Sequence, residues 1–148
     1  MQSYSQRNPL WATSNIKGSD VSIGRFGCTL TCIADLSTYF GDNLNPGKIN
    51  ELCKFTSNGL IYWMSANFSS FVFDRRFYGR DNAEILKALA DPYRAVILQV
   101  AAGSHWVVAT GWQKEIADFK IADPWLGDWS NMARYGRDVT GFATFKRK

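Results

Sequence analysis

Around its first cysteine the chain reads Gly24-Arg25-Phe26-Gly27-Cys28-Thr29-Leu30-Thr31-Cys32-Ile33-Ala34-Asp35-Leu36. The two glycines make the first part of this segment a flexible loop, and the apolar residues after it recur at helical spacing. Cys28 therefore stands at the start of a predicted helix, where unpaired N–H groups and the positive dipole end favour a thiolate over a thiol. Because the thiolate is nucleophilic, we expect Cys28 to attack a carbonyl carbon. The rest of the chain must then supply a base, an orienting group and an oxyanion site.

Length and composition predict one globular domain over residues 1–148. Hydrophobic residues make up 46% of the chain and charged residues 20%, which is ordinary for a protein with a packed core. The net charge is +4, and the basic residues are scattered except at Arg75-Arg76 and Lys146-Arg147-Lys148. We therefore expect a solvated basic surface and no nucleic-acid partner.

Residues 1–7 are polar and do not resemble a secretory signal. The longest apolar run, about residues 95–102, is too short to span a membrane. These features leave the compartment open. With three cysteines, one histidine and no Cys-x-x-Cys motif, we expect free thiols and neither a metal site nor a cofactor.

The periodicity changes along the chain from helical to alternating, which predicts an α+β fold with helices first and an antiparallel sheet after them. Residues 1–27 are expected to be loop-rich and anchored in the core by Trp11 and Ile16. The predicted helices cover 28–40, 46–54 and 85–90, with a short one near 60–67. The predicted strands cover 70–78, 95–101, 105–112, 118–123 and 140–145.

His105 is the only histidine and opens a predicted strand directly after a glycine-containing turn, where its side chain can face a cleft. If the following hairpin turns near Lys114, residues whose numbers sum to about 228 face each other, which pairs His105 with Asp123. Cross-strand neighbours have Cβ atoms about 4.5–5.5 Å apart, within reach of a hydrogen bond between these side chains. We expect Asp123 to fix the imidazole tautomer, while His105 deprotonates Cys28 and later protonates the leaving group.

Two roles in this site keep more than one candidate. Asp118 is a weaker alternative for the orienting carboxylate, because it lies near the predicted hairpin tip. The oxyanion donors are the backbone N–H of Cys28 and a side-chain amide from Gln6 or Gln2. Position along the chain does not choose between these two glutamines.

The other cysteines and the tryptophans have separate expected roles. Cys32 lies one helical turn deeper than Cys28, and we expect both Cys32 and Cys53 to be unreactive core thiols. Aromatic side chains in loop-like contexts or beside the histidine can wall a substrate groove. The residues assigned to this wall are Trp63, Trp106 and Trp125.

Four segments, in this order, resemble the peptidase C39-like branch of the papain-like cysteine peptidases. They are Gln6-Arg7-Asn8-Pro9-Leu10-Trp11-Ala12, Ile23-Gly24-Arg25-Phe26-Gly27-Cys28-Thr29-Leu30-Thr31, His105-Trp106-Val107-Val108 and Asp123-Pro124-Trp125-Leu126-Gly127. The resemblance implies a papain-like fold, with the cysteine-bearing helix packed on a C-terminal antiparallel sheet. It also implies that Gln6 is the oxyanion glutamine, Cys28 the nucleophile, His105 the base and Asp123 the orienting residue.

These patterns predict a cysteine peptidase or amidohydrolase that cleaves a peptide or isopeptide bond in a peptide or peptidoglycan-like substrate. Small domains of this kind resemble proteins encoded by bacteria and their phages. The alternative is a papain-like fold that serves as a structural or binding component of a larger viral or bacterial assembly, such as a phage particle. The resembling family includes members that have lost the catalytic residues.

Overall fold

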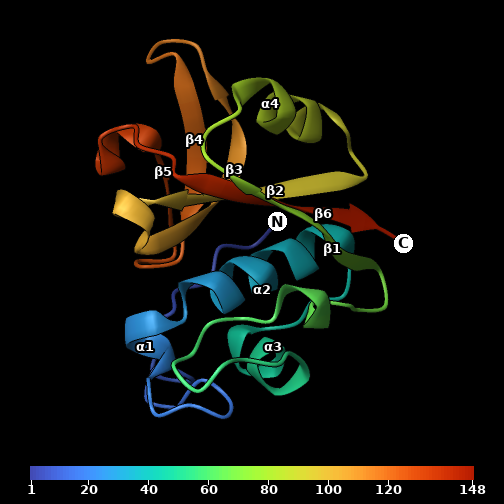
Figure 1. Ribbon diagram of the computed structural model, residues 1–148, viewed down its shortest axis with the longest axis vertical. Helices are drawn as coiled ribbons and strands as arrows, with labels where there is room; N and C mark the ends of the chain where they lie inside the picture. Colours follow the sequence, from blue (N-terminus) through green and yellow to red (C-terminus); the bar gives the residue numbers. More distant parts are fainter.

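All 148 residues are described by the computed structural model, which contains one antiparallel six-stranded sheet (Figure 1). The strands are β1 (Phe71–Tyr78), β2 (Arg94–Val100), β3 (His105–Gln113), β4 (Asp118–Asp123), β5 (Asp128–Asn131) and β6 (Gly141–Arg147). Their order across the sheet is β1-β6-β2-β3-β4-β5. The central strands β2 and β3 are adjacent, so the turn between them lies near the middle of the sheet.

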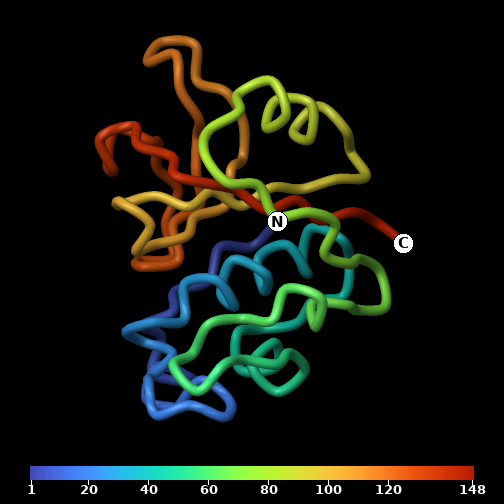
Figure 2. Tube along the Cα trace, viewed as in Figure 1, coloured from blue at the N-terminus to red at the C-terminus, as the bar shows by residue number.

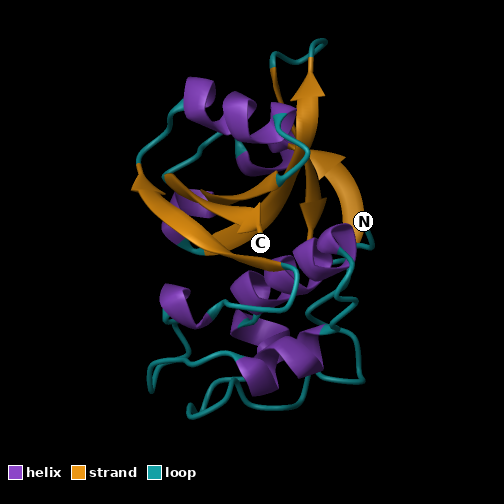
Figure 3. Cartoon of the chain, turned by 90° about the vertical axis from the view of Figure 1, so that its right-hand side faces the viewer, coloured by secondary structure: helices purple, strands orange, loops and turns teal.

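Helices cover both faces of this sheet (Figures 1 and 3). They are α1 (Ile23–Phe26), α2 (Cys28–Phe40), α3 (Pro46–Leu52) and α4 (Asn82–Ala90). The first three lie on one face and α4 on the other, so the α+β class is confirmed. None of the helices has the length and apolar character needed to cross a membrane.

Helix α2 is the element that carries Cys28, and it packs against β3. It starts directly after Gly27 and ends at Gly41, which adopts the left-handed conformation with φ of 97° that a helix C-terminus favours. Leu30, Ile33, Leu36 and Phe40 are all buried, as their helical spacing predicts. Burial of this face stabilises α2 against β3.

Strand β2 contributes to two separate cores because its successive side chains point to opposite faces of the sheet. Ala95 and Ile97 belong to the core under α2, whereas Val96 and Leu98 belong to the core under α4. This double burial explains why the sequence of β2 is apolar without alternation. Trp11 and Ile16 are buried in the core under α2, which confirms them as anchors of the N-terminal segment.

The register of the β3–β4 hairpin differs by two residues from the sequence prediction. Val108 pairs with Ala122, and the turn occupies residues 114–117. The loop is longer than a turn centred on Lys114 requires, and its last residue, Ala117, has a φ of 50°. His105 is therefore a diagonal neighbour of Asp123 and does not lie directly opposite it.

Several element boundaries also differ. The helix predicted to reach residue 54 ends at Leu52, and the short helix near 60–67 is a single 3₁₀ turn at Trp63–Ser65. The helix α1 and the strand β5 were not predicted, and neither were the short 3₁₀ turns at Ala101–Gly103 and Met132–Tyr135. Helix α1 is only one turn long and contains a glycine, and β5 has no alternation of apolar and polar residues.

The N-terminal segment connects the sheet with the helical half of the molecule (Figure 2). The backbone N–H of Gln6 donates to the carbonyl of Pro124 after β4, and the N–H of Gly24 donates to the carbonyl of Ala12. The indole N–H of Trp11 donates to the carbonyl of Ser5 at 2.8 Å. These bonds place Gln6 at the end of the sheet where β3 begins and β4 ends.

Candidate active site

The structure brings His105, Asp123 and Cys28 together at the N-terminus of α2. His105 begins β3, Asp123 ends β4, and the His105 Nε2 lies 2.8 Å from the Asp123 Oδ1. A long side chain can bridge a diagonal cross-strand pair, so the two-residue register difference does not separate them. Cys28 lines the same cleft as His105, and its interaction with the imidazole helps to raise the pKa of His105. Because Nε2 faces the carboxylate, Nδ1 is the ring nitrogen left for the thiol.

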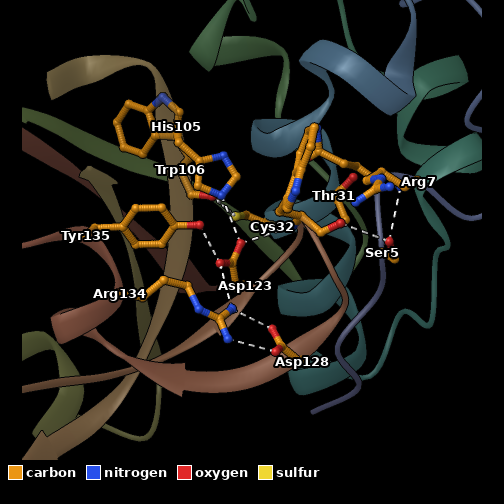
Figure 4. Close-up of polar contacts among 12 residues, drawn as sticks. Ser5, Arg7, Thr31, Cys32, His105, Trp106, Asp123, Asp128, Arg134 and Tyr135 are labelled. Carbon is orange, nitrogen blue, oxygen red and sulfur yellow. Dashed lines mark hydrogen bonds and ion pairs between the residues drawn. The ribbon is translucent and has the colours of Figure 1, made fainter. Parts of the chain in front are cut away.

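Asp123 has no exposed surface and is surrounded by donors, as Figure 4 shows for three of them. Besides His105, it accepts from the backbone N–H of Trp125 at 3.0 Å, the Arg134 Nη1 at 3.0 Å and the Tyr135 hydroxyl at 2.5 Å. Burial by itself would raise the pKa of Asp123. The hydrogen bonds from these four donors outweigh burial and hold that pKa well below its usual range.

The charge on His105 follows from the same contacts. Burial lowers the pKa of His105, but the hydrogen bond with Asp123 and the interactions with Cys28 outweigh burial and raise it to about 9. The imidazole is therefore protonated at neutral pH.

Gln6 lies beside this group in the wall of the same cleft. Its side chain is 1% exposed, its Nε2 donates to the carbonyl of Gly24 at 3.3 Å, and its Oε1 has no hydrogen-bond partner. Gln2 does not line the cleft, and its backbone N–H donates to the hydroxyl of Thr38 in the last turns of α2. The geometry thus separates the two glutamines that the sequence left as alternatives.

A cleft of about 630 Å³ opens over Cys28 and His105. The three predicted wall residues, Trp63, Trp106 and Trp125, all line it. Trp63 meets Trp106 edge to face, with ring centroids 5.3 Å apart. Trp125 is 41% exposed, and the guanidinium of Arg7 lies 4.8 Å from its ring. The other lining residues are Arg25, Phe26, Thr29, Asn58, Gly59, Leu60, Ile61, Arg76, Tyr78, Gln99, Gly103, Ser104 and Tyr135.

The weaker candidates lie elsewhere. Cys32 is fully buried, its thiol donates to the carbonyl of Trp106 at 3.4 Å, and burial raises its pKa well above the ordinary value. Burial likewise raises the pKa of Cys53 to about 11. Asp118, at the far end of β4, pairs with the Arg80 Nη2 at 2.8 Å. All three cysteines are free, and no group of His, Cys, Asp or Glu side chains has the arrangement of a metal site.

Sequence reasoning missed the residues that support Asp123. Arg134 reaches Asp123 while forming two bonds to Asp128, at 2.8 and 2.9 Å, and Tyr135 follows it in the same 3₁₀ turn. This turn comes after β5, which was not predicted. No motif in the sequence marks it as part of the site.

Comparison with known proteins shows the fold. No protein-family model matches the chain, and no curated protein sequence matches it. Among solved structures, the chain is similar to a double glycine motif protease from an AMS/PCAT transporter, crystallised in complex with the leader peptide. The TM-score is 0.58 with 18% identity, and the match covers 82% of this chain and 84% of that one. At this identity the likeness is evidence about the fold alone, and it supports the papain-like fold expected from the sequence.

Proposed function

We propose that the protein is a thiol hydrolase that cleaves a peptide or isopeptide bond, with Cys28 as nucleophile, His105 as base and acid, and Asp123 as orienting residue. The observation that carries this proposal is the position of the His105 ring. It lies between a buried carboxylate and a thiol at a helix N-terminus, inside an open cleft. This arrangement is that of an activated nucleophile with an oriented base.

The reaction follows from these positions. In the resting pair that we propose, His105 already holds the proton of Cys28, and the sulfur attacks the carbonyl carbon as a thiolate, forming a C–S bond and a tetrahedral oxyanion. The C–N bond then breaks as the imidazolium gives its proton to the leaving amine. Water attacks the resulting thioester, His105 takes the proton of that water, and breaking the C–S bond releases the carboxylic acid and restores the thiolate beside the protonated imidazole.

The oxyanion site in this proposal combines two donors. The backbone N–H of Cys28 lies in the first turn of α2, where N–H groups have no intrahelical partner. The Gln6 amide has two N–H groups and donates one to Gly24, so the other is free for an oxyanion. In the proposal, Trp63, Trp106 and Trp125 bound the groove for the peptide. The structural neighbour is a protease bound to a leader peptide, which supports a peptide substrate.

Selective alkylation tests the proposal. We expect brief iodoacetamide treatment, followed by mass spectrometry of tryptic peptides, to label Cys28 well before Cys32 and Cys53. Access alone favours Cys28, which is 8% exposed, whereas the other two have no exposed surface. The His105→Gln variant separates access from activation, and we expect it to slow Cys28 labelling about tenfold or more.

The Gln113→Ala variant, at the far end of β3, is the matched control and keeps the wild-type rate. A wild-type protein and a Cys28→Ala variant are then incubated with a peptide mixture, and new peptide termini are counted by mass spectrometry. Equal labelling rates for Cys28 in wild type and His105→Gln, with no new termini, would contradict the proposal. That result would favour the structural or binding role of the fold.

A further inference from the structure

Arg76 places a guanidinium group in the wall of the cleft without a carboxylate partner. The side chain comes from β1 and is half-buried. Its Nη2 donates to the Gln99 Oε1 at 3.0 Å, and its Nη1 donates to the carbonyl of Phe77. A guanidinium carries five N–H donors, so three remain after these two bonds. Arg76 takes part in none of the ion pairs of the structure.

Two aromatic rings hold this guanidinium in place. It lies 4.3 Å from the centroid of the Tyr78 ring and 4.9 Å from that of the Trp106 ring. Arg76 and Trp106 line the same cleft as the proposed catalytic residues Cys28 and His105. Burial lowers the pKa of Arg76 because a charged guanidinium is costly to keep away from water, and no carboxylate forms an ion pair with it to offset that cost. An anion beside Arg76 would accept hydrogen bonds from its unused N–H donors and would balance the positive charge of the guanidinium.

Gly141 leaves the space for the Arg76 head group. A Cβ atom at Gly141 would lie 2.5 Å from the Arg76 Nη1 and 3.0 Å from the Gln99 Oε1. This glycine lies at the start of β6 and does not have a positive φ, so no turn requires it. Gln99 in turn donates from Nε2 to the carbonyl of Gly103 at 3.1 Å. The Arg76 head group is thus held by two hydrogen-bond acceptors and two aromatic rings, and it fills the space that the missing side chain of Gly141 leaves.

The charges of the whole cleft have one sign. Its lining contains the side chains of Arg25 and Arg76 and of no Asp or Glu. Arg25 is exposed on α1 and, like Arg76, forms no ion pair. The carboxylate of Asp123 lies below the cleft and is occupied by its four donors. An anionic substrate would therefore meet two guanidinium groups without ion-pair partners and no carboxylate.

We propose that Arg76 binds a carboxylate of the substrate, so that the enzyme prefers peptides that are acidic next to the scissile bond. Arginine recognises a carboxylate through paired charge-assisted hydrogen bonds, and its fixed fork suits a group held at a defined distance from the nucleophile. The carboxylate can belong to an Asp or Glu side chain or to the C-terminus of a short peptide. This inference rests on the proposed function and names its substrate class.

Paired alkylating reagents test the inference without knowledge of the peptide sequence. Iodoacetyl-glycine carries a terminal carboxylate, and iodoacetyl-glutamate α-amide carries a side-chain carboxylate. Their neutral partners are iodoacetyl-glycinamide and iodoacetyl-glutamine amide. In each case the Cys28 thiolate forms a C–S bond and iodide leaves. The rate of Cys28 labelling is measured by mass spectrometry and expressed as the ratio of acid to amide, which cancels changes in the reactivity of the thiol itself.

We expect Arg76→Gln to lower this ratio about tenfold, the loss typical of a hydrogen bond to a charged group. Arg76→Lys keeps the charge without the fork and should give an intermediate ratio. Arg75→Gln is the matched control, because Arg75 is the exposed neighbour on the same strand and does not line the cleft. It should keep the wild-type ratio. The reagent pair with the larger effect identifies which carboxylate source the cleft accepts.

The two proposals fail in different ways. If the neutral reagents label Cys28 rapidly but the acid-to-amide ratio is the same in wild type, Arg76→Gln and Arg76→Lys, the carboxylate site is wrong and the thiol hydrolase stands. An equal slowing of acid and amide in Arg76→Gln gives an unchanged ratio and also overturns the site. Slow labelling of Cys28 by all four reagents in the wild-type protein overturns the proposed function and this inference together.

Discussion

His105 contacts its two partners through different sides of one ring. The Asp123 carboxylate hydrogen bonds with the His105 Nε2. Its three other donors stabilise the ionised carboxylate, so Asp123 does not take the proton from the imidazole. The proton therefore stays on the imidazole, next to the thiol of Cys28. The pKa of His105 is raised because its interactions with Asp123 and Cys28 favour the protonated ring over the neutral ring.

The single histidine makes this raised pKa directly measurable. We expect the His105 ring signals in NMR spectra to titrate with a midpoint near pH 9, instead of the 6.5 of an isolated histidine. Asp123→Asn removes the partner charge and should lower the midpoint by about 1 to 3 pH units. Cys28→Ser removes the second hydrogen-bond partner and should lower it by less.

Urea-unfolded protein is the control for this titration, and its midpoint should return to about 6.5. Asp118→Asn is a second control, since Asp118 is a buried carboxylate on the same strand that does not touch His105. A folded-state midpoint at or below 6.5 with Asp123 intact would show that the imidazole is neutral at rest. The proton transfer from Cys28 would then have to occur during the reaction.

The junction between α1 and α2 positions Cys28, and Gly27 is its critical residue. A Cβ atom at Gly27 would lie 2.6 Å from the carbonyl oxygen of Ile23 and 2.7 Å from its Cγ2. Ile23 is fully buried, so the junction must move to accept the methyl group. We expect Gly27→Ala to lower the free energy of unfolding by about 1–3 kcal/mol and to slow alkylation of Cys28.

Gly41→Ala, at the other end of α2, separates stability from positioning. Gly41 has a φ of 97° and no neighbouring atom within 4 Å of an added Cβ. This variant should lose about 1–2 kcal/mol through backbone strain alone, while Cys28 keeps its reactivity. Urea unfolding and iodoacetamide rates measure the two effects. Equal alkylation rates in the two glycine variants would show that the junction does not position the thiol.

Local sequence signals predicted the elements of the site, and non-local pairing supplied what they missed. Helical spacing and Gly41 predicted α2, and the segments 105–112 and 118–123 were predicted as the two strands of a hairpin, β3 and β4. The length of the turn at residues 114–117 set the register, which no local pattern encodes. Arg76 enters the cleft because β1 pairs with β6, a contact between segments about seventy residues apart in sequence. Arg134 and Tyr135 reach Asp123 because β5 folds back along β4.

At the scale of the whole molecule, a second buried acid ties α2 to the N-terminal segment. Asp35 has no exposed surface, its Oδ1 accepts the backbone N–H of Tyr4 at 2.7 Å, and its Oδ2 has no partner. Burial raises the pKa of Asp35 to about 8. The carboxyl group is therefore protonated near neutral pH in the folded protein. Tyr4 lies two residues before Gln6, so this contact helps to hold the proposed oxyanion donor in place.

Asp35 and His105 together predict how the stability of the molecule depends on pH. In the unfolded chain a carboxyl group titrates near 4 and an imidazole near 6.5. Between these values and the folded pKa values of about 8 and about 9, the folded protein binds more protons than the unfolded chain. Stability must then fall as pH rises, first through Asp35 and then through His105. Asp123 acts in the opposite direction, but only below about pH 4, because its folded pKa is lowered.

We therefore expect the free energy of unfolding to be highest near pH 4–5 and to decrease by roughly 2 kcal/mol or more by pH 9. Urea unfolding at a series of pH values measures this decrease. The Asp35→Asn variant should have a flatter profile between pH 4 and 8, since the residue no longer titrates. Asp20→Asn, which removes an exposed carboxylate, should keep the wild-type slope. If wild type and Asp35→Asn have parallel profiles between pH 4 and 8, the buried acid is already ionised in the folded protein, and the prediction is wrong.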